Sequence, residues 1–156
     1  MVVQIREFDR KVVSNLITFL QEDNNFVDIP VASSIYDQDS NLIVQTKNLK
    51  AQLNDPTCHS EILSIKEAAK LKNNYNLEGL SLYVTLEPCL MCAGAILESK
   101  ISKLVFGAFR QKTNLFSPIE IVRSENKKIE IVSGVLEAEC SEVLTNWFTN
   151  HRSLSK

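Results

Sequence analysis

Two cysteines and one histidine have the residue types and the spacing of a metal site. Cys89 and Cys92 form a Cys-x-x-Cys that follows an apolar segment and Pro88 and opens a predicted helix. The unpaired amides and positive end of that helix would stabilise thiolates. His59 begins another predicted helix and could be the third ligand. Three protein ligands leave one tetrahedral position for water, which is the catalytic rather than the structural zinc pattern.

Glu61 lies two residues after His59 and is the candidate proton carrier. Zinc lowers the pKa of bound water towards neutrality, so a neighbouring carboxylate can accept the water's proton and pass it on. The four residues together therefore predict hydrolytic chemistry at a zinc ion, with Glu61 as the general acid and base.

Other interpretations of the same residues remain open. A Cys-x-x-Cys alone can be a dithiol redox pair or two buried helix cysteines. The His-x-Glu upstream, at the start of a helix, disfavours both. A zinc module that binds RNA or protein without catalysis is a further alternative, and Cys58 as a fourth ligand would favour it. Cys140 is interpreted as an apolar core residue of the last helix.

Composition indicates an ordinary globular protein. The chain has 156 residues, 44% of them hydrophobic and 23% charged, which predicts a single domain over residues 1–156. No apolar run approaches the roughly 18 residues that would span a bilayer. Residues 1–10 mix charges with apolar residues and lack the pattern of a signal peptide. We therefore expect a cytoplasmic protein that does not enter a membrane.

The charge distribution is compatible with a local nucleic-acid contact. The formal net charge of −2 argues against a non-specific nucleic-acid binder. Residues 99–113 nevertheless carry basic residues and no acidic ones, and these residues could hold phosphates or form an ordinary solvated face. The four basic residues of this stretch are Lys100, Lys103, Arg110 and Lys112.

The pattern of apolar residues predicts strands that alternate with helices. We expect strands over 31–36, 42–46, 80–86, 104–106 and 129–132, and helices over 7–23, 58–72, 89–99 and 136–148. The first two strands read as a hairpin, Thr57 as the cap of the second helix, and residues 118–128 are ambiguous. The apolar continuity of 80–86 predicts burial on both faces. An α/β fold with a mixed sheet follows.

These motifs resemble a known family. His-x-Glu followed by Pro-Cys-x-x-Cys is the signature of zinc nucleobase deaminases, and the wider sequence resembles the bacterial tRNA-specific adenosine deaminases. The resemblance covers about residues 26–148. It is carried by the stretches 55–61, 82–96, 105–108 and 134–140. The chain departs from the family at Ala32, where glycine is usual, and over 109–114, where an acidic residue is lost.

The resemblance implies a three-layer α/β/α cytidine deaminase-like fold, with a central five-stranded mixed sheet and an N-terminal β-hairpin. It implies a homodimer with one Zn²⁺ per subunit that acts on a tRNA anticodon loop and converts adenosine to inosine at the wobble position. By position, His59, Cys89 and Cys92 would hold zinc and Glu61 would shuttle the proton. The substrate-binding residues would be Asn48, Val31, Leu86 and Phe148. A deaminase of a free base or nucleoside, of the guanine or cytosine type, is the alternative.

Overall fold

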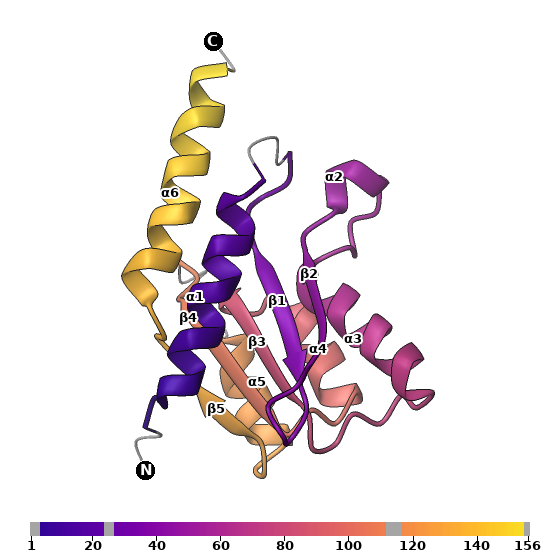
Figure 1. The fold of residues 1–156 in the computed structure, drawn as a ribbon. Coiled ribbons are helices and arrows are strands. Elements are labelled where there is room, and N and C mark those ends of the chain that lie inside the picture. Colours follow the sequence, from indigo (N-terminus) through magenta and orange to yellow (C-terminus); the bar gives the residue numbers. More distant parts are fainter. Residues whose placement is uncertain (1–3, 24–26, 112–116, 155–156) are drawn as a thin grey trace.

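A five-stranded sheet with helices on both faces forms the body of the protein (Figure 1). The computed structural model describes residues 4–23, 27–111 and 117–154. The strands are β1 (Ala32–Tyr36), β2 (Leu42–Lys47), β3 (Ser81–Leu86), β4 (Lys103–Ala108) and β5 (Glu130–Val132). The helices are α1 (Glu7–Gln21), α2 (Lys50–Leu53), α3 (Ser60–Lys72), α4 (Leu90–Glu98), α5 (Pro118–Glu125) and α6 (Glu137–Leu154).

The sheet is mixed, and its strand order is β2-β1-β3-β4-β5. β1 and β2 form the antiparallel N-terminal hairpin, and β1 also pairs antiparallel with β3. β3, β4 and β5 are parallel, so their carboxyl ends meet at one edge of the sheet. We call this the carboxyl edge and the opposite one the amino edge. The predicted mixed sheet and hairpin are confirmed.

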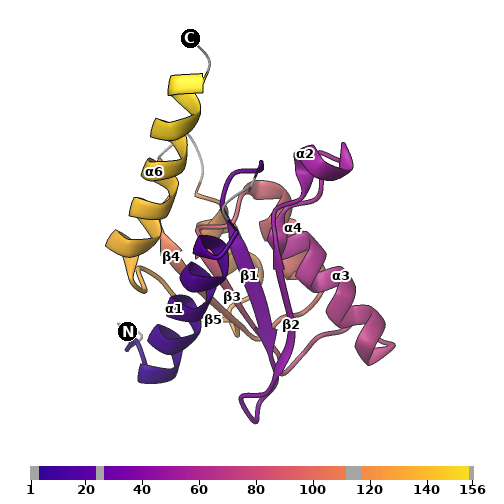
Figure 2. The ribbon, with the colours of Figure 1, turned by 45° about the horizontal axis from the view of Figure 1, so that its top comes forward.

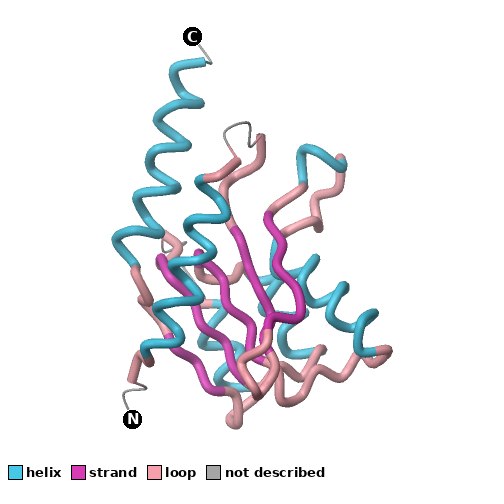
Figure 3. Tube along the Cα trace, in the orientation of Figure 1, coloured by secondary structure: helices cyan, strands magenta, loops and turns pink. Residues whose placement is uncertain are grey.

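The layers follow from the alternation of side chains along the strands. Leu82 and Val84 of β3 pack into the core shared with α3, α4 and α5, whereas Tyr83 packs towards α1 and α6. All three are nearly inaccessible to solvent, which confirms burial on both faces of this strand. Figures 2 and 3 show the resulting three layers, with α1 and α6 on one side of the sheet.

The close approach of α6 to the sheet explains a glycine in β4. A Cβ atom built on Gly107 would lie 2.3 Å from the Cys140 sulfur and 2.8 Å from the Thr85 carbonyl oxygen, too near for any side chain. Cys140 is 1% exposed, as expected for a core residue. Its burial raises the pKa of the thiol to about 12.

Three details differ from the sequence prediction. Thr57 does not cap α3, because its hydroxyl donates to Asp55 at 2.6 Å and His59 occupies the N-cap position. The short helix α2 lies between β2 and α3, where the pattern of apolar residues predicts no helix, and α6 continues well beyond Phe148. The ambiguous stretch after residue 117 begins with α5, whose first residue, Pro118, suits a helix N-terminus. None of the helices in the described part of the chain is both long and apolar enough to cross a bilayer.

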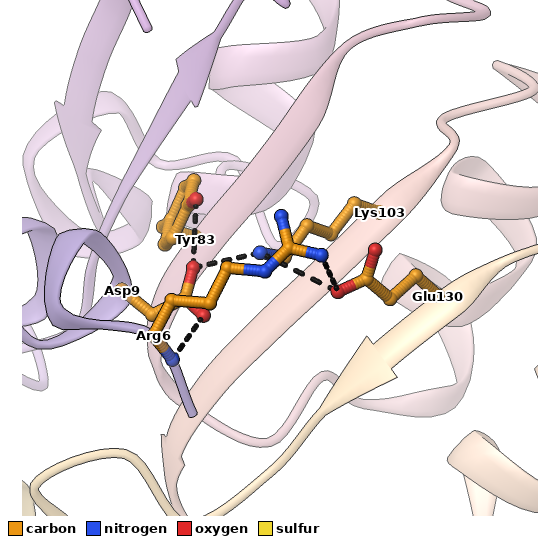
Figure 4. Close-up of polar contacts among 5 residues, drawn as sticks. All are labelled: Arg6, Asp9, Tyr83, Lys103 and Glu130. Carbon is orange, nitrogen blue, oxygen red and sulfur yellow. Dashed lines mark hydrogen bonds and ion pairs between the residues drawn. The ribbon is translucent and has the colours of Figure 1, made fainter. Parts of the chain in front are cut away.

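A charged cluster at the amino edge joins α1 to three strands (Figure 4). Asp9 is fully buried, and its carboxylate accepts hydrogen bonds from Lys103 Nζ at 2.7 Å and the Tyr83 hydroxyl at 3.0 Å. Glu130 lies 3.6 Å from Lys103 and 3.3 Å from Arg6. Burial, followed by the Asp9 charge, raises the pKa of Tyr83 well above its usual value. This cluster fixes α1 against the sheet.

Candidate active site

The predicted metal ligands come together where two helices begin at the carboxyl edge. His59 is the N-cap residue of α3, and Cys89 is the N-cap residue of α4. Cys92 follows in the first turn of α4 and is fully buried. His59 Nδ1 lies 3.5 Å from the sulfur of each cysteine, and the two sulfurs are 3.6 Å apart. Both N-cap residues have extended backbones, which turns their side chains away from the helix axes and towards each other.

These separations fit a zinc ion. Tetrahedral bonds of about 2.3 Å to sulfur and about 2.0 Å to nitrogen put two sulfur ligands about 3.8 Å apart and sulfur and nitrogen about 3.5 Å apart. The distances in the cluster agree with both values to within a few tenths of an ångström. Within the described residues, this is the one group of three or more His, Cys, Asp or Glu side chains close enough to hold a metal. Cys58 is buried nearby but does not belong to it.

The two thiols differ in acidity because they share a hydrogen bond. The bond from the Cys92 thiol is the main cause that lowers the pKa of Cys89 to about 4, with burial opposing and the positive charges of His59 and Arg110 assisting. The same bond and burial raise the pKa of Cys92 far above its usual value. The pair therefore holds one thiolate and one thiol until a metal displaces the remaining proton.

Glu61 lies in the first turn of α3 and is 1% exposed. Burial raises the pKa of its carboxyl group, with the His59 charge and a hydrogen bond from Ser60 opposing this effect. The Ser60 hydroxyl donates to Glu61 Oε2 at 3.1 Å, and the Ser60 amide donates to Asn48 Oδ1 at 2.8 Å. A buried carboxyl group with a raised pKa suits proton transfer near neutral pH.

A cavity of about 210 Å³ opens onto Glu61 and His59. Three of the residues predicted to bind substrate, Val31, Asn48 and Leu86, line it. Asn48 is held on both sides of its amide, since its Nδ2 also donates to the Ile29 carbonyl at 3.1 Å. The lining thus combines apolar side chains, one fixed amide and a buried carboxyl group, which are the features of a small-molecule pocket.

The remaining predicted contacts lie in different places. Phe148 is 42% exposed on α6 and does not line the cavity. Arg110, two residues after β4, does line it. Lys112 lies outside the described residues. Lys100 follows α4 and Lys103 begins β4, so both lie at the amino edge, about 16 Å from the carboxyl edge at the usual rise of a strand.

The expectation that Lys103 contacts RNA is wrong in this fold. Its side chain is only 10% exposed, and its ammonium group is committed to Asp9 and Glu130. The sequence around Lys103, which lies between Ser102 and Leu104, gave no sign that this lysine would be buried, because its acidic partner Asp9 lies 94 residues away.

The structure also adds three cavity residues that sequence reasoning missed, Asp28, Ile29 and Lys50. Lys50 follows Asn48 by two residues, and this proximity was the available signal. A larger groove of about 670 Å³ lies at the amino edge beside the charged cluster. We assign the active site to the smaller cavity because it alone of the two is lined by Glu61 and by His59, one of the three predicted metal ligands.

Comparisons with known proteins agree with this site. The family model of the cytidine and deoxycytidylate deaminase zinc-binding region matches residues 6–108. A tRNA-specific adenosine deaminase of Haemophilus influenzae is 39% identical over 96% of this chain and 88% of its own length. That of Bacillus subtilis is 42% identical over 74% of this chain and 73% of its own length.

Solved structures show the same fold. One from work on A-to-I editing by tRNA:A34 deaminases at the wobble position has a TM-score of 0.75 and 29% identity, and the match covers 86% of this chain and 99% of that one. A guanine deaminase of Nitrosomonas europaea has a TM-score of 0.71 at 22% identity, over 94% of this chain and 86% of that one, which supports the fold alone.

The fold and the metal-binding group thus define a zinc-dependent deaminase of the cytidine deaminase-like class. Within that class, the chain belongs to the tRNA-specific adenosine deaminase family.

Proposed function

We propose that this protein hydrolyses adenosine to inosine at the wobble position of a tRNA anticodon. The observation that carries the proposal is the cavity, which is lined by Glu61 and His59, in a chain 39% identical to a tRNA-specific adenosine deaminase. The two cysteines cluster with His59. In this proposal His59, Cys89 and Cys92 hold one zinc ion. When bound, zinc supplies the acidification of water that makes a nucleophile available at neutral pH.

Glu61 carries the protons of the reaction. Its carboxylate accepts a proton from the attacking water, whose oxygen bonds to C6 of the adenine, and delivers it to the ring nitrogen N1. The carboxylate then takes the proton of the new C6 hydroxyl group and passes it to the amine at C6. The C–N bond breaks, the C6 carbonyl forms, and ammonia leaves. The buried position of Glu61 supports this role, because a carboxyl group whose pKa is raised can both accept and donate a proton near neutral pH.

The substrate base is held by the cavity walls in this proposal. Val31 and Leu86 contact its faces, and the Asn48 amide, which two backbone groups hold in place, hydrogen-bonds its edge. A base reaches such a pocket only after it leaves its stack, so a single-stranded anticodon loop is a suitable substrate. Phe148 is exposed on α6 and is the candidate to stack on a neighbouring nucleotide.

The homodimer and the cytoplasmic location are also proposals. Leu90 and Met91, in the first turn of α4, are 63% and 37% exposed, and such apolar side chains beside a site favour an interface. The four cysteines are free in this structure, which suits a reducing compartment. Analytical ultracentrifugation of the zinc-loaded protein at several concentrations would test the dimer.

A comparison of substrates and one variant tests the proposed reaction. The wild-type protein should form inosine in a tRNA anticodon stem-loop that carries adenosine at the wobble position, and release one ammonia per inosine. Glu61→Gln should retain zinc but lose turnover by at least about a thousandfold, because Gln cannot move a proton. Turnover of free guanine or cytosine in place of the stem-loop would favour the alternative, a deaminase of free bases. Full activity of Glu61→Gln would refute the proton-carrier role.

A further inference from the structure

Arg110 is held at the cavity in a fixed orientation. Its backbone amide donates to Glu87 Oε2 at 3.0 Å, and its Nε donates to the Glu87 carbonyl oxygen at 2.7 Å. Glu87 itself is only 9% exposed, so this anchor is rigid. The two terminal nitrogens of the guanidinium group have no hydrogen-bond or ion-pair partner among the described residues. Four N–H groups of a fixed cation are therefore available where the cavity opens.

Lys50 is a second cation that lines the same cavity. It is the first residue of α2, and its side chain is exposed. Its ammonium group forms no ion pair within the described part of the chain. Asp28, the acidic residue nearby in the lining, is already engaged, since its carboxylate accepts the amides of Ala51 at 2.9 Å and Gln52 at 3.4 Å.

The two cations come from separate parts of the chain. Lys50 lies beyond β2, at one end of the strand order, and Arg110 lies beyond β4, on the other side of β1 and β3. An uncharged base needs no cation to enter an apolar cavity, whereas a nucleotide within a strand carries a phosphate on each side of its sugar. A planar guanidinium group with free terminal nitrogens matches two phosphate oxygens, and an ammonium group serves as a point charge for a third contact.

We propose that Lys50 and Arg110 form a cationic rim that binds the phosphodiesters on either side of the target nucleoside. This inference rests on the proposed function and deepens it, because it makes the phosphates of a strand part of what the site recognises. Free bases and nucleosides lack these phosphates. The rim therefore selects a nucleotide within a strand over the same base in solution.

Binding measurements with charge-removing variants test the rim. The probe is a fluorescein-labelled anticodon stem-loop, its binding is followed by anisotropy at several salt concentrations, and every protein carries Glu61→Gln to prevent turnover. Lys50→Gln and Arg110→Gln should each weaken binding about tenfold and lower the slope of log Kd against log salt by about one. Arg110→Lys should recover the slope but only part of the affinity, because Lys lacks the anchored planar group.

Lys72→Gln is the matched control. Lys72 is exposed at the far end of α3, about 18 Å along the helix from the site, so removing its charge should leave Kd and slope unchanged. Zinc content and circular dichroism of each variant establish that it is folded. If Arg110→Gln disturbs the turn around Glu87, Lys50→Gln still tests the rim, because Lys50 lies outside that turn.

A chemical change in the RNA tests the position of the contacts. Stem-loops with one uncharged methylphosphonate linkage, placed either next to the wobble adenosine or four nucleotides away, are bound to each protein. The adjacent change should weaken binding to the protein with an intact rim about tenfold, and should have little effect on Lys50→Gln/Arg110→Gln. The distant change should affect both proteins equally.

The outcomes separate the rim from the reaction. Binding by the rim variants that equals that of the Lys72→Gln control, or equal effects of the two methylphosphonates, would overturn the rim even if the wild-type protein makes inosine. Rim-dependent binding of the stem-loop without inosine formation by the wild-type protein would support the rim and overturn the proposed reaction instead.

Discussion

Replacing Lys103 by methionine should destabilise the protein strongly, although the residue lies far from the active site. The substitution keeps a long unbranched side chain but removes the cation that pairs with Asp9. Asp9 is fully buried, and its remaining hydrogen bonds come from Tyr83 at 3.0 Å and the Arg6 amide at 3.1 Å. Leaving a buried charge without its partner typically costs about 3–5 kcal/mol. Because two hydrogen bonds survive, we expect about 3 kcal/mol.

Thermal and urea unfolding of the zinc-loaded protein, followed by circular dichroism, would measure this loss. For a chain of this length, 3 kcal/mol lowers Tm by about 6–12 °C. Lys72→Met, on the exposed end of α3, is the matched control and should stay within about 0.5 kcal/mol of the wild type. The double variant Asp9→Asn/Lys103→Met should recover part of the loss, because Asn is neutral and still accepts the Tyr83 hydrogen bond.

The result that would refute this reasoning is specific. If Lys103→Met is no less stable than Lys72→Met, the ion pair contributes nothing in the folded state. If the double variant is less stable than Lys103→Met alone, the loss comes from altered packing and not from the unpaired charge of Asp9.

Three further predictions concern the site and the core. Ser60→Ala removes the hydrogen bond to Glu61 Oε2 and should lower kcat about tenfold at unchanged KM. The control Ser64→Ala removes a buried hydroxyl group that bonds to Ser33 and Thr46, and it should leave kcat unchanged. Equal losses of kcat in the two variants would show that the effect does not come from orientation of the Glu61 carboxylate. Zinc uptake between pH 7 and 8 should release one proton from the thiol pair, because the pKa of Cys89 is lowered to about 4 and that of Cys92 is raised. Calorimetry in buffers of different ionisation enthalpy would measure the number of protons released. A count of no protons or of two protons per zinc would contradict the prediction. Burial raises the pKa of the Cys140 thiol to about 12 from about 9, so the stabilisation that the neutral thiol provides is complete below pH 9 and is lost as the pH rises towards 12. Over that range, the difference in unfolding free energy between wild type and Cys140→Ala should shrink by about 1.4 kcal/mol per pH unit. A difference that stays constant would contradict the assignment.

The sequence predicted best what depends on neighbouring residues. The Cys-x-x-Cys and His-x-Glu spacings located the metal cluster and Glu61, because each motif fixes its own geometry at the start of a helix. The strands were found within one or two residues of their observed bounds, since their apolar runs end at turn residues.

What the sequence did not reveal depends on partners far along the chain. Lys103 belonged to a basic stretch by composition, and only the folded sheet shows that Asp9 pairs with it. Lys50 looked like any loop lysine until the fold placed it in the lining of the cavity with Arg110. Thr57 had the right type for a cap but bonds to Asp55 instead, because a local turn competes with the helix for its hydroxyl group.

The two edges of the sheet also differ in what evolution or an engineer can change. The charged cluster of Figure 4 holds α1, β3, β4 and β5 together at the amino edge, whereas every residue proposed for chemistry lies at the carboxyl edge. Substitutions that tighten the first edge would create a reserve of stability without touching the pocket. Such a reserve would let the pocket accept substitutions for new substrate bases that would otherwise unfold the protein.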